Sequence, residues 1–110
     1  MFFTGFLDRC TKEEPLVKIS EIIWLEDIVE KLAWKHHVQQ YEIIEVLQRN
    51  PKFRLVEKGH RQGEHVYSAS GQTEAGRYLI IFFVYKRNKQ ALLVSARDMS
   101  NAERKRYESK

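Results

Sequence analysis

The feature that most constrains the fold of this chain is an uninterrupted apolar run from Tyr78 to Tyr85. Its residues are mostly β-branched or aromatic, which favours a strand, and an unbroken apolar run is typical of a strand buried on both faces in the middle of a sheet. Residues 86–89 interrupt the run and include Asn88, which tolerates a positive φ in a tight turn. A second apolar run, Ala91 to Ala96, is expected to return as an antiparallel neighbour. The sequence therefore predicts a central hairpin around which the rest of the chain packs.

A short charged helix is predicted after this hairpin. Ser100 and Glu103 have the spacing of a capping box, in which the serine hydroxyl accepts from the amide of Glu103 and the glutamate reaches back to the amide of Ser100. Arg97 stands at the exit of the preceding strand.

The residues before the hairpin predict one strand and two helices. Val17 to Trp24 alternates loosely and is rich in β-formers. From Leu25 to His36, apolar residues recur at helical spacing, and acidic residues crowd the first turn, where the helix dipole favours them. A second helix fits Tyr41 to Arg49 and ends at Asn50-Pro51, because a residue before proline avoids the α region.

Two further short strands complete the predicted order, which is β-α-α-β-β-β-β-α. They span Phe53 to Glu57 and Glu64 to Ser70, separated by a glycine-bounded loop. The expected fold is α+β, a small antiparallel sheet with two N-terminal helices and a C-terminal helix packed against it. We interpret residues 17–110 as a single domain and residues 1–16 as an N-terminal extension.

The cysteine content and the absence of long apolar segments indicate the cellular compartment of the protein. The single cysteine, Cys10, excludes an intramolecular disulfide and suits a reducing compartment. The longest apolar run is far short of the roughly 20 residues that span a bilayer, and residues 1–16 lack the early positive charge of a signal peptide. We therefore expect a cytoplasmic protein.

The charges are distributed unevenly along the chain. Residues 1–50 contain 6 Lys/Arg against 9 Asp/Glu, whereas residues 51–110 contain 13 against 6. A basic second half suggests a surface that faces a polyanion such as nucleic acid. The alternative is that many small proteins are mildly basic without binding nucleic acid.

Common catalytic and cofactor motifs are absent from the sequence. It has no glycine-rich phosphate loop, no Gly-x-Ser-x-Gly, no Cys-x-x-Cys and no dinucleotide fingerprint. His60 and His65 lack companions at metal-ligand spacing, and Cys10 has no obvious base beside it. We therefore expect neither a metal nor a cofactor.

The strongest candidates for chemistry are two arginines. Arg77 precedes the central strand and Arg97 ends its neighbour, so antiparallel pairing is expected to place them at the same edge of the sheet. Two guanidinium groups there could clamp a phosphate. The alternative is that each pairs with a local acid, such as Glu74 or Asp98.

Other candidates have competing interpretations. Lys35, His36 and His37 end the first helix, where a cation suits the dipole and where His36 also continues the apolar stripe. Glu103 and Tyr107 share one face of the last helix, although the cap alone explains Glu103 and packing against the sheet explains Tyr107. A metal-free ribonuclease needs such side chains: a base for the 2′-hydroxyl, cations for the phosphorane and an acid for the 5′-oxygen.

Several short patterns, taken together, resemble the BrnT family of bacterial type II toxins. The similarity covers roughly residues 20–108, and its most specific part is the end of the hairpin followed by the last helix. The patterns are Lys35-His36-x-Val38, Gly63-Glu64-x-x-Tyr67, Gly71-x-Thr73-x-x-Gly76-Arg77-x-Leu79, Val94-Ser95-Ala96-Arg97 and Glu103-Arg104-x-x-Tyr107.

The resemblance implies a RelE-like fold and metal-independent cleavage of RNA that inhibits translation. It also implies a neutralising antitoxin of the ribbon-helix-helix type, whose complex with the toxin binds promoter DNA. The candidate catalytic positions that it implies are Lys35, His36, Glu64, Arg77, Arg97, Glu103 and Tyr107, and the candidate RNA-binding positions are Arg77, Arg97 and Arg104. In this scheme the arginines stabilise the phosphate, Lys35 or His36 assists, and Glu64, Glu103 or Tyr107 orients groups or acts as base.

A second interpretation is a catalytically silent module that binds an antitoxin-like partner and DNA. Gln72 stands where many family members have arginine, and Asp98 stands where they have a basic or small residue. A carboxylate next to Arg97 could neutralise it. A third interpretation, a small basic domain whose residues have structural roles throughout, predicts neither a partner nor salt-dependent affinity for RNA.

Overall fold

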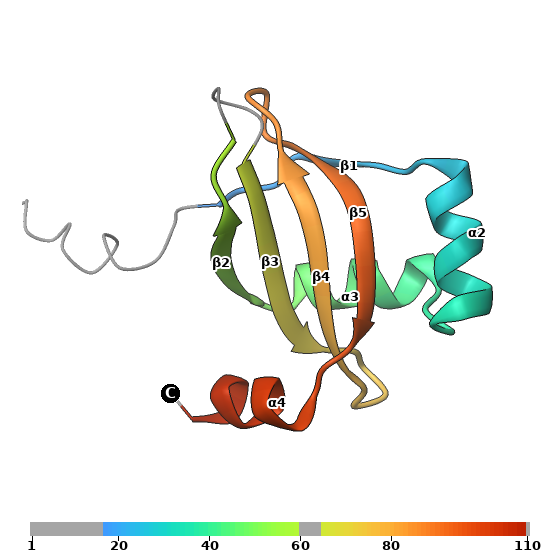
Figure 1. The fold of residues 1–110 in the computed structure, drawn as a ribbon, viewed down its shortest axis with the longest axis vertical. Helices are drawn as coiled ribbons and strands as arrows, with labels where there is room; N and C mark the ends of the chain where they lie inside the picture. The colour runs from blue at the N-terminus through green and yellow to red at the C-terminus, as the bar shows by residue number, and fades with distance from the viewer. Residues whose placement is uncertain (1–16, 60–64, 110) are drawn as a thin grey trace, which may run out of the picture.

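In chain order, the fold has one strand, two helices, four strands and a last helix (Figure 1). The computed structural model describes residues 17–59 and 65–109. The predicted extension, residues 1–16, and Glu64 lie outside these residues. The elements are β1 (Glu21–Ile23), α2 (Glu26–Lys35), α3 (Gln40–Gln48), β2 (Lys52–Glu57), β3 (His65–Gln72), β4 (Tyr78–Tyr85), β5 (Gln90–Asp98) and α4 (Asn101–Glu108).

The sheet has five strands in the order β1-β5-β4-β3-β2. The four strands from β2 to β5 pair antiparallel, as predicted. However, β1 pairs parallel to β5, with Ile22 opposite Ala91, so the sheet is mixed and the prediction of a purely antiparallel sheet is wrong at this edge. Because two helices rather than a hairpin follow β1, no tight turn fixes its direction. The predicted strand from Val17 to Trp24 is also reduced to three residues.

The central strand β4 is buried unequally on its two sides. Leu79, Ile81 and Phe83 are almost completely buried and define what we call the helix face of the sheet. The alternate residues Ile80 and Phe82 define the other side, the open face; Ile80 is 7% exposed and Phe82 is half-buried. The prediction of burial on both faces is therefore only partly correct.

Helices α2 and α3 cover the helix face, as predicted. Leu32 of α2 and Ile43 and Val46 of α3 join the strands in one apolar core. The approach of α3 is close: a Cβ atom added at Gly71 of β3 would lie 3.0 Å from Cγ1 of Val46. This contact explains why a glycine occurs inside a strand.

The last helix, α4, begins with the predicted capping box. The amide of Glu103 donates to the Ser100 hydroxyl (3.2 Å), and the amide of Ser100 donates to the Glu103 carboxylate (2.8 Å). None of its side chains is fully buried, and Tyr107 meets Tyr78 edge-on with ring centroids 5.9 Å apart. The helix therefore packs only at the end of the sheet where β4 begins, and the described helices leave most of the open face uncovered (Figure 1).

The hairpin turn between β4 and β5 differs in one detail from the prediction. Lys89, not Asn88, has the positive φ, at 68°. Asn88 stabilises the turn through its side chain, which accepts from the amide of Gln90 (3.3 Å). Across the described residues, no helix has both the length and the apolar character needed to cross a membrane.

Candidate functional site

The predicted site residues fall into two groups on opposite faces of the sheet. In the pairing of β4 with β5, Arg97 lies opposite Ile80 on the open face and Asp98 lies opposite Leu79 on the helix face. Arg77 bonds to Asp98, so its side chain belongs to the helix face. The two arginines share one end of the sheet, as predicted, but they lie on opposite faces, so of the two alternatives the structure favours pairing with local acids over a shared phosphate clamp.

A β-bulge causes this separation. Phe82 pairs with Ser95 whereas Phe83 pairs with Leu93, so Val94 is an extra residue in β5. Such an insertion reverses the faces of all residues that follow it. Without the bulge, counting in twos from the buried Leu93 would have placed Arg97 on the helix face.

Arg77 joins three elements beneath the helix face. Its Nε donates to Asp98 Oδ1 (2.7 Å), and its Nη1 donates to both carboxylate oxygens of Glu42 on α3 (3.0 and 3.1 Å). Nη1 and Nη2 also donate to the backbone carbonyls of His37 (2.6 Å) and His36 (3.0 Å) at the end of α2. All three nitrogens of the guanidinium therefore bond to other residues of the protein. Pairing with Asp98 agrees with the alternative that each arginine pairs with a local acid.

The residues around Arg77 act as partners of this arginine. Its hydrogen bonds hold the pKa of the Asp98 carboxyl below its usual range, so Asp98 neutralises Arg77 and not Arg97. Lys35 is the exposed last residue of α2, and His36 is its C-cap. His37 has a φ of 56°, which ends the helix in the left-handed region. Lys35 and His36 therefore lie with Arg77 and apart from the open-face group.

On the open face, Arg97 and Glu103 form a two-pronged ion pair. Nη1 and Nη2 of Arg97 donate to the two carboxylate oxygens of Glu103 at 2.8 and 2.9 Å. The pair with Arg97, helped by the Ser100 amide, lowers the pKa of Glu103 to about 2. A carboxylate with such a pKa is a weak base at neutral pH, which argues against Glu103 as the general base. Its observed role is to fix Arg97, whose guanidinium lies 5.5 Å from the Phe82 ring centroid.

Arg104 and Tyr107 lie on α4 beside Tyr78. Arg104 stacks over the Tyr78 ring at 4.1 Å and contacts Glu108 at 3.5 Å. The hydroxyl of Tyr78 donates to Glu108 (2.8 Å), and this bond raises the pKa of Tyr78. In contrast, the hydroxyl of Tyr107 makes no hydrogen bond to any residue in the described part of the chain. Tyr107 therefore packs through its ring, and its hydroxyl is left without a partner among the described residues.

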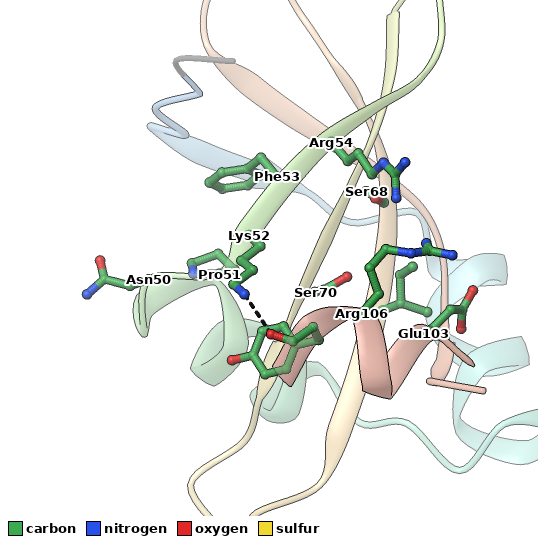
Figure 2. A pocket seen from close by; sticks show the side chains of 11 residues that line it. Asn50, Pro51, Lys52, Phe53, Arg54, Ser68, Ser70, Glu103 and Arg106 are labelled. Atoms are coloured by element: carbon green, nitrogen blue, oxygen red, sulfur yellow. Dashed lines mark hydrogen bonds between the residues drawn. The ribbon is translucent and has the colours of Figure 1, made fainter. Parts of the chain in front are cut away.

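A pocket of about 460 Å³ opens between α4 and the open face of strands β2 to β4 (Figure 2). It brings together two predicted residues, Glu103 and Tyr107, with several that the sequence analysis did not single out. Its lining residues are Asn50, Pro51, Lys52, Phe53, Arg54, Ser68, Ser70, Ile80, Glu103, Arg106 and Tyr107.

Three cations line this pocket. Lys52 Nζ donates to the backbone carbonyl of Tyr107 (2.6 Å) and lies 4.9 Å from its ring. Within residues 17–59 and 65–109, neither Arg54 nor Arg106 has a carboxylate partner. Figure 2 shows their guanidinium groups, one from β2 and one from α4, extending over the same side of the pocket. The pocket therefore presents positive charge that the described residues do not neutralise.

Two serine hydroxyls of β3 also line the pocket. Ser68 is only 3% exposed, and Ser70 lies two residues along on the same side of the strand. Neither hydroxyl has a hydrogen-bond partner among the described residues. Leaving a buried hydroxyl unpaired costs roughly 1–3 kcal/mol. Such an arrangement is expected where a ligand or water supplies the missing bond.

The sequence did contain a signal for the missed residues. Lys52 and Arg54 alternate along one strand, as Ser68 and Ser70 do along its neighbour, and β2 pairs with β3 so that Arg54 lies opposite Ser68 and Lys52 opposite Ser70. Reading the two predicted strands as a pair would have put Arg54, Ser68 and Ser70 on one surface, whereas Lys52 lies one residue before the predicted strand. Analysing each strand separately could not predict this surface, because it does not show which residues of neighbouring strands lie opposite each other.

The fold and the site together define the chain as an α+β protein with a mixed five-stranded sheet and a cationic pocket on its open face. The described residues contain no group of three His, Cys, Asp or Glu side chains that could hold a metal ion. Comparison with known protein families gives no match, and comparison with curated proteins gives none either.

Proposed function

We propose that this chain is a BrnT-like toxin of a type II toxin–antitoxin system, with a RelE-like fold, and that it cleaves RNA in the cytoplasm without a metal and so inhibits translation. The observation that carries the proposal is the pocket in which Lys52, Arg54 and Arg106 present charge without a carboxylate partner among residues 17–59 and 65–109. Cations held on a folded surface without internal partners favour a polyanionic ligand.

The pocket side chains suit the chemistry of RNA cleavage. Attack by the 2′-hydroxyl needs a group that takes its proton, cations for the charge that develops on the phosphorane, and a group that protonates the 5′-oxygen. Arg54 and Arg106 bind the scissile phosphate in this proposal, whereas Glu103 balances the charge of Arg97 on the same face. The amine of Lys52 and the hydroxyl of Tyr107, which has no hydrogen-bond partner among the described residues, are the proton-transfer groups.

The remaining parts of the proposal concern partners. A cognate antitoxin of the ribbon-helix-helix type would neutralise the toxin, and the complex would bind its promoter DNA. The sequence patterns described above support this part. Arg77, fully bonded beneath the helix face, is given a structural role and not a catalytic one.

A specific observation favours a second candidate function, the catalytically silent module that binds an antitoxin-like partner and DNA. Two of the three arginines that the resemblance implies are neutralised, Arg77 by Asp98 and Glu42 and Arg97 by Glu103. A silent module would bind its partner without cutting RNA.

The test compares growth and RNA cleavage for the wild type, Arg106→Ala and Lys105→Ala. Arg106 lines the pocket and Lys105 does not, although both are exposed cations on α4 and are expected to be equally dispensable for folding. We expect the wild type and Lys105→Ala to arrest growth, and Arg106→Ala to cut RNA at least about tenfold more slowly because a phosphate contact is lost.

Each contrary outcome is informative. If none of the three proteins arrests growth or cuts RNA, while the chain still binds a partner, the silent module replaces the proposed ribonuclease. If all three arrest growth equally, the activity lies outside this pocket.

A further inference from the structure

The pocket has two chemically distinct parts. Its cations, Arg54 and Arg106, extend over one side, as Figure 2 shows. Its floor contains the apolar side chain of Ile80 and the hydroxyls of Ser68 and Ser70. A site for phosphate alone has no need of an apolar floor or of a serine as buried as Ser68, so the floor points to a ligand that is more than a phosphate group.

The floor fits a flat, partly polar group. A hydroxyl both donates and accepts. Ser68 and Ser70, whose hydroxyls have no partner among the described residues, can therefore bond to any mixture of ring nitrogens, amino groups and carbonyls along the edge of a nucleobase. Ile80 and Pro51 offer apolar contact for its ring. The volume of about 460 Å³ lies within the range of roughly 300–1,000 Å³ found for small-molecule sites.

We infer that the pocket takes up one unpaired nucleobase of single-stranded RNA, with Ser68 and Ser70 bonded to its edge and the flanking phosphates on Arg54 and Arg106. The inference rests on the proposed function and adds to it the substrate class. In duplex RNA the base edges are already paired and the bases stacked, whereas a single strand can turn a base outward. The site therefore selects single strands over duplexes.

The test measures binding of a short fluorescent RNA to the full chain by anisotropy. The RNA carries 2′-O-methyl groups throughout, which removes the 2′-hydroxyl and so separates binding from cleavage. It is offered as a single strand and, annealed to its complement, as a duplex. We expect the single strand to bind about tenfold more tightly, which corresponds to roughly one or two hydrogen bonds made only by the unpaired base.

Matched serine variants test whether a hydroxyl of the pocket floor bonds to the unpaired base. Ser68→Ala should weaken binding of the single strand about fivefold and leave the duplex unchanged, since one hydrogen bond is lost. Ser95→Ala is the control, because Ser95 lies on the open face opposite Phe82 but does not line the pocket. The Ser68 hydroxyl has no hydrogen-bond partner among the described residues, so its removal leaves none of their polar groups unbonded. This variant is therefore expected to fold.

A competition separates the base from the phosphate. Mononucleotides should displace the single strand more effectively than inorganic phosphate at the same concentration. The nucleobase inference would be overturned if mononucleotides and inorganic phosphate displaced the strand equally. It would also be overturned if strand and duplex bound with equal affinity and Ser68→Ala had no effect. In both cases the RNA would still be bound by the cations, and the proposed function would stand. Absence of any RNA binding would instead overturn the proposed function itself.

Discussion

At the scale of single residues, hydrogen-bond partners decide what a charged side chain can do. Glu103 has the position expected of a catalytic carboxylate, on the last helix and next to the pocket. Its three hydrogen bonds, two from Arg97 and one from Ser100, stabilise the charged form and lower its pKa to about 2. Tyr107, one turn further along α4, has an unbonded hydroxyl and so retains the freedom to react.

Glu103→Gln should reveal this stabilisation through its dependence on pH. The pKa of Glu103 is lower in the folded protein than in the unfolded chain, so its contribution is complete above about pH 4.5 and is lost as the pH falls toward about 2. Because Arg97 is 40% exposed and solvent screens the pair, we expect the variant to lose only about 1–2 kcal/mol at pH 7.

The measurement is the free energy of unfolding in urea at several pH values for both proteins. Glutamine can keep the capping-box bond through its amide oxygen, but its NH2 group cannot accept from Arg97. The dependence of the difference on pH, and not its size at one pH, therefore reports the charge of Glu103. A difference that remained constant from pH 7 to pH 2 would show that the ion pair contributes nothing to stability.

At the scale of elements, the sequence predicted local structure well and relations between elements less well. The bounds of β4 coincide with the apolar run Tyr78–Tyr85, because continuous burial leaves a direct trace in composition. In contrast, nothing in the composition indicated the parallel direction of β1. The bulge at Val94, which decides the face of Arg97, could not be predicted either. A bulge depends on how two strands pair, and the sequence of one strand alone does not reveal it.

Arg77 shows how one side chain can hold several elements together. It bonds to Glu42 of α3, to Asp98 of β5 and to the carbonyls of His36 and His37, the residues that follow α2. Its planar fork reaches all of them at once, which the ammonium group of lysine cannot do. We interpret Arg77 as the residue that fixes the turn between α2 and α3 against the sheet.

Arg77→Lys is therefore expected to lower the free energy of unfolding by about 2–3 kcal/mol, since it leaves partly buried acceptors without donors. Arg106→Lys is the control: Arg106 is exposed and has no carboxylate partner among the described residues, so a change within about 0.5 kcal/mol is expected. Urea unfolding of both variants at neutral pH provides the measurement. Equal stabilities would contradict the structural role given to Arg77.

At the scale of the whole molecule, charge is separated in space as well as in sequence. The acidic residues Glu26, Asp27 and Glu30 lie on α2, whereas Arg104, Lys105 and Arg106 lie on α4. Figure 1 shows α4 at the end of the sheet where β4 begins and α2 beside the sheet, next to β5. A polyanion approaching this molecule is thus attracted to α4 and its pocket and repelled by the acidic residues of α2.

The dependence of RNA affinity on salt tests whether this asymmetry acts through the pocket. Each phosphate neutralised by a cation releases counterions, so log affinity falls with log salt concentration by about 0.7 per contact for a single strand. Three contacts, from Lys52, Arg54 and Arg106, therefore predict a slope of about −2. Arg106→Gln should make the slope shallower by about 0.7, whereas Lys31→Gln on the acidic α2 should leave it unchanged, because that cation lies outside the pocket. Both variants remove one positive charge from the chain and so alter its net charge equally. If they changed the slope by the same amount, RNA would be responding to net charge alone, and the assignment of its phosphates to the pocket would be wrong.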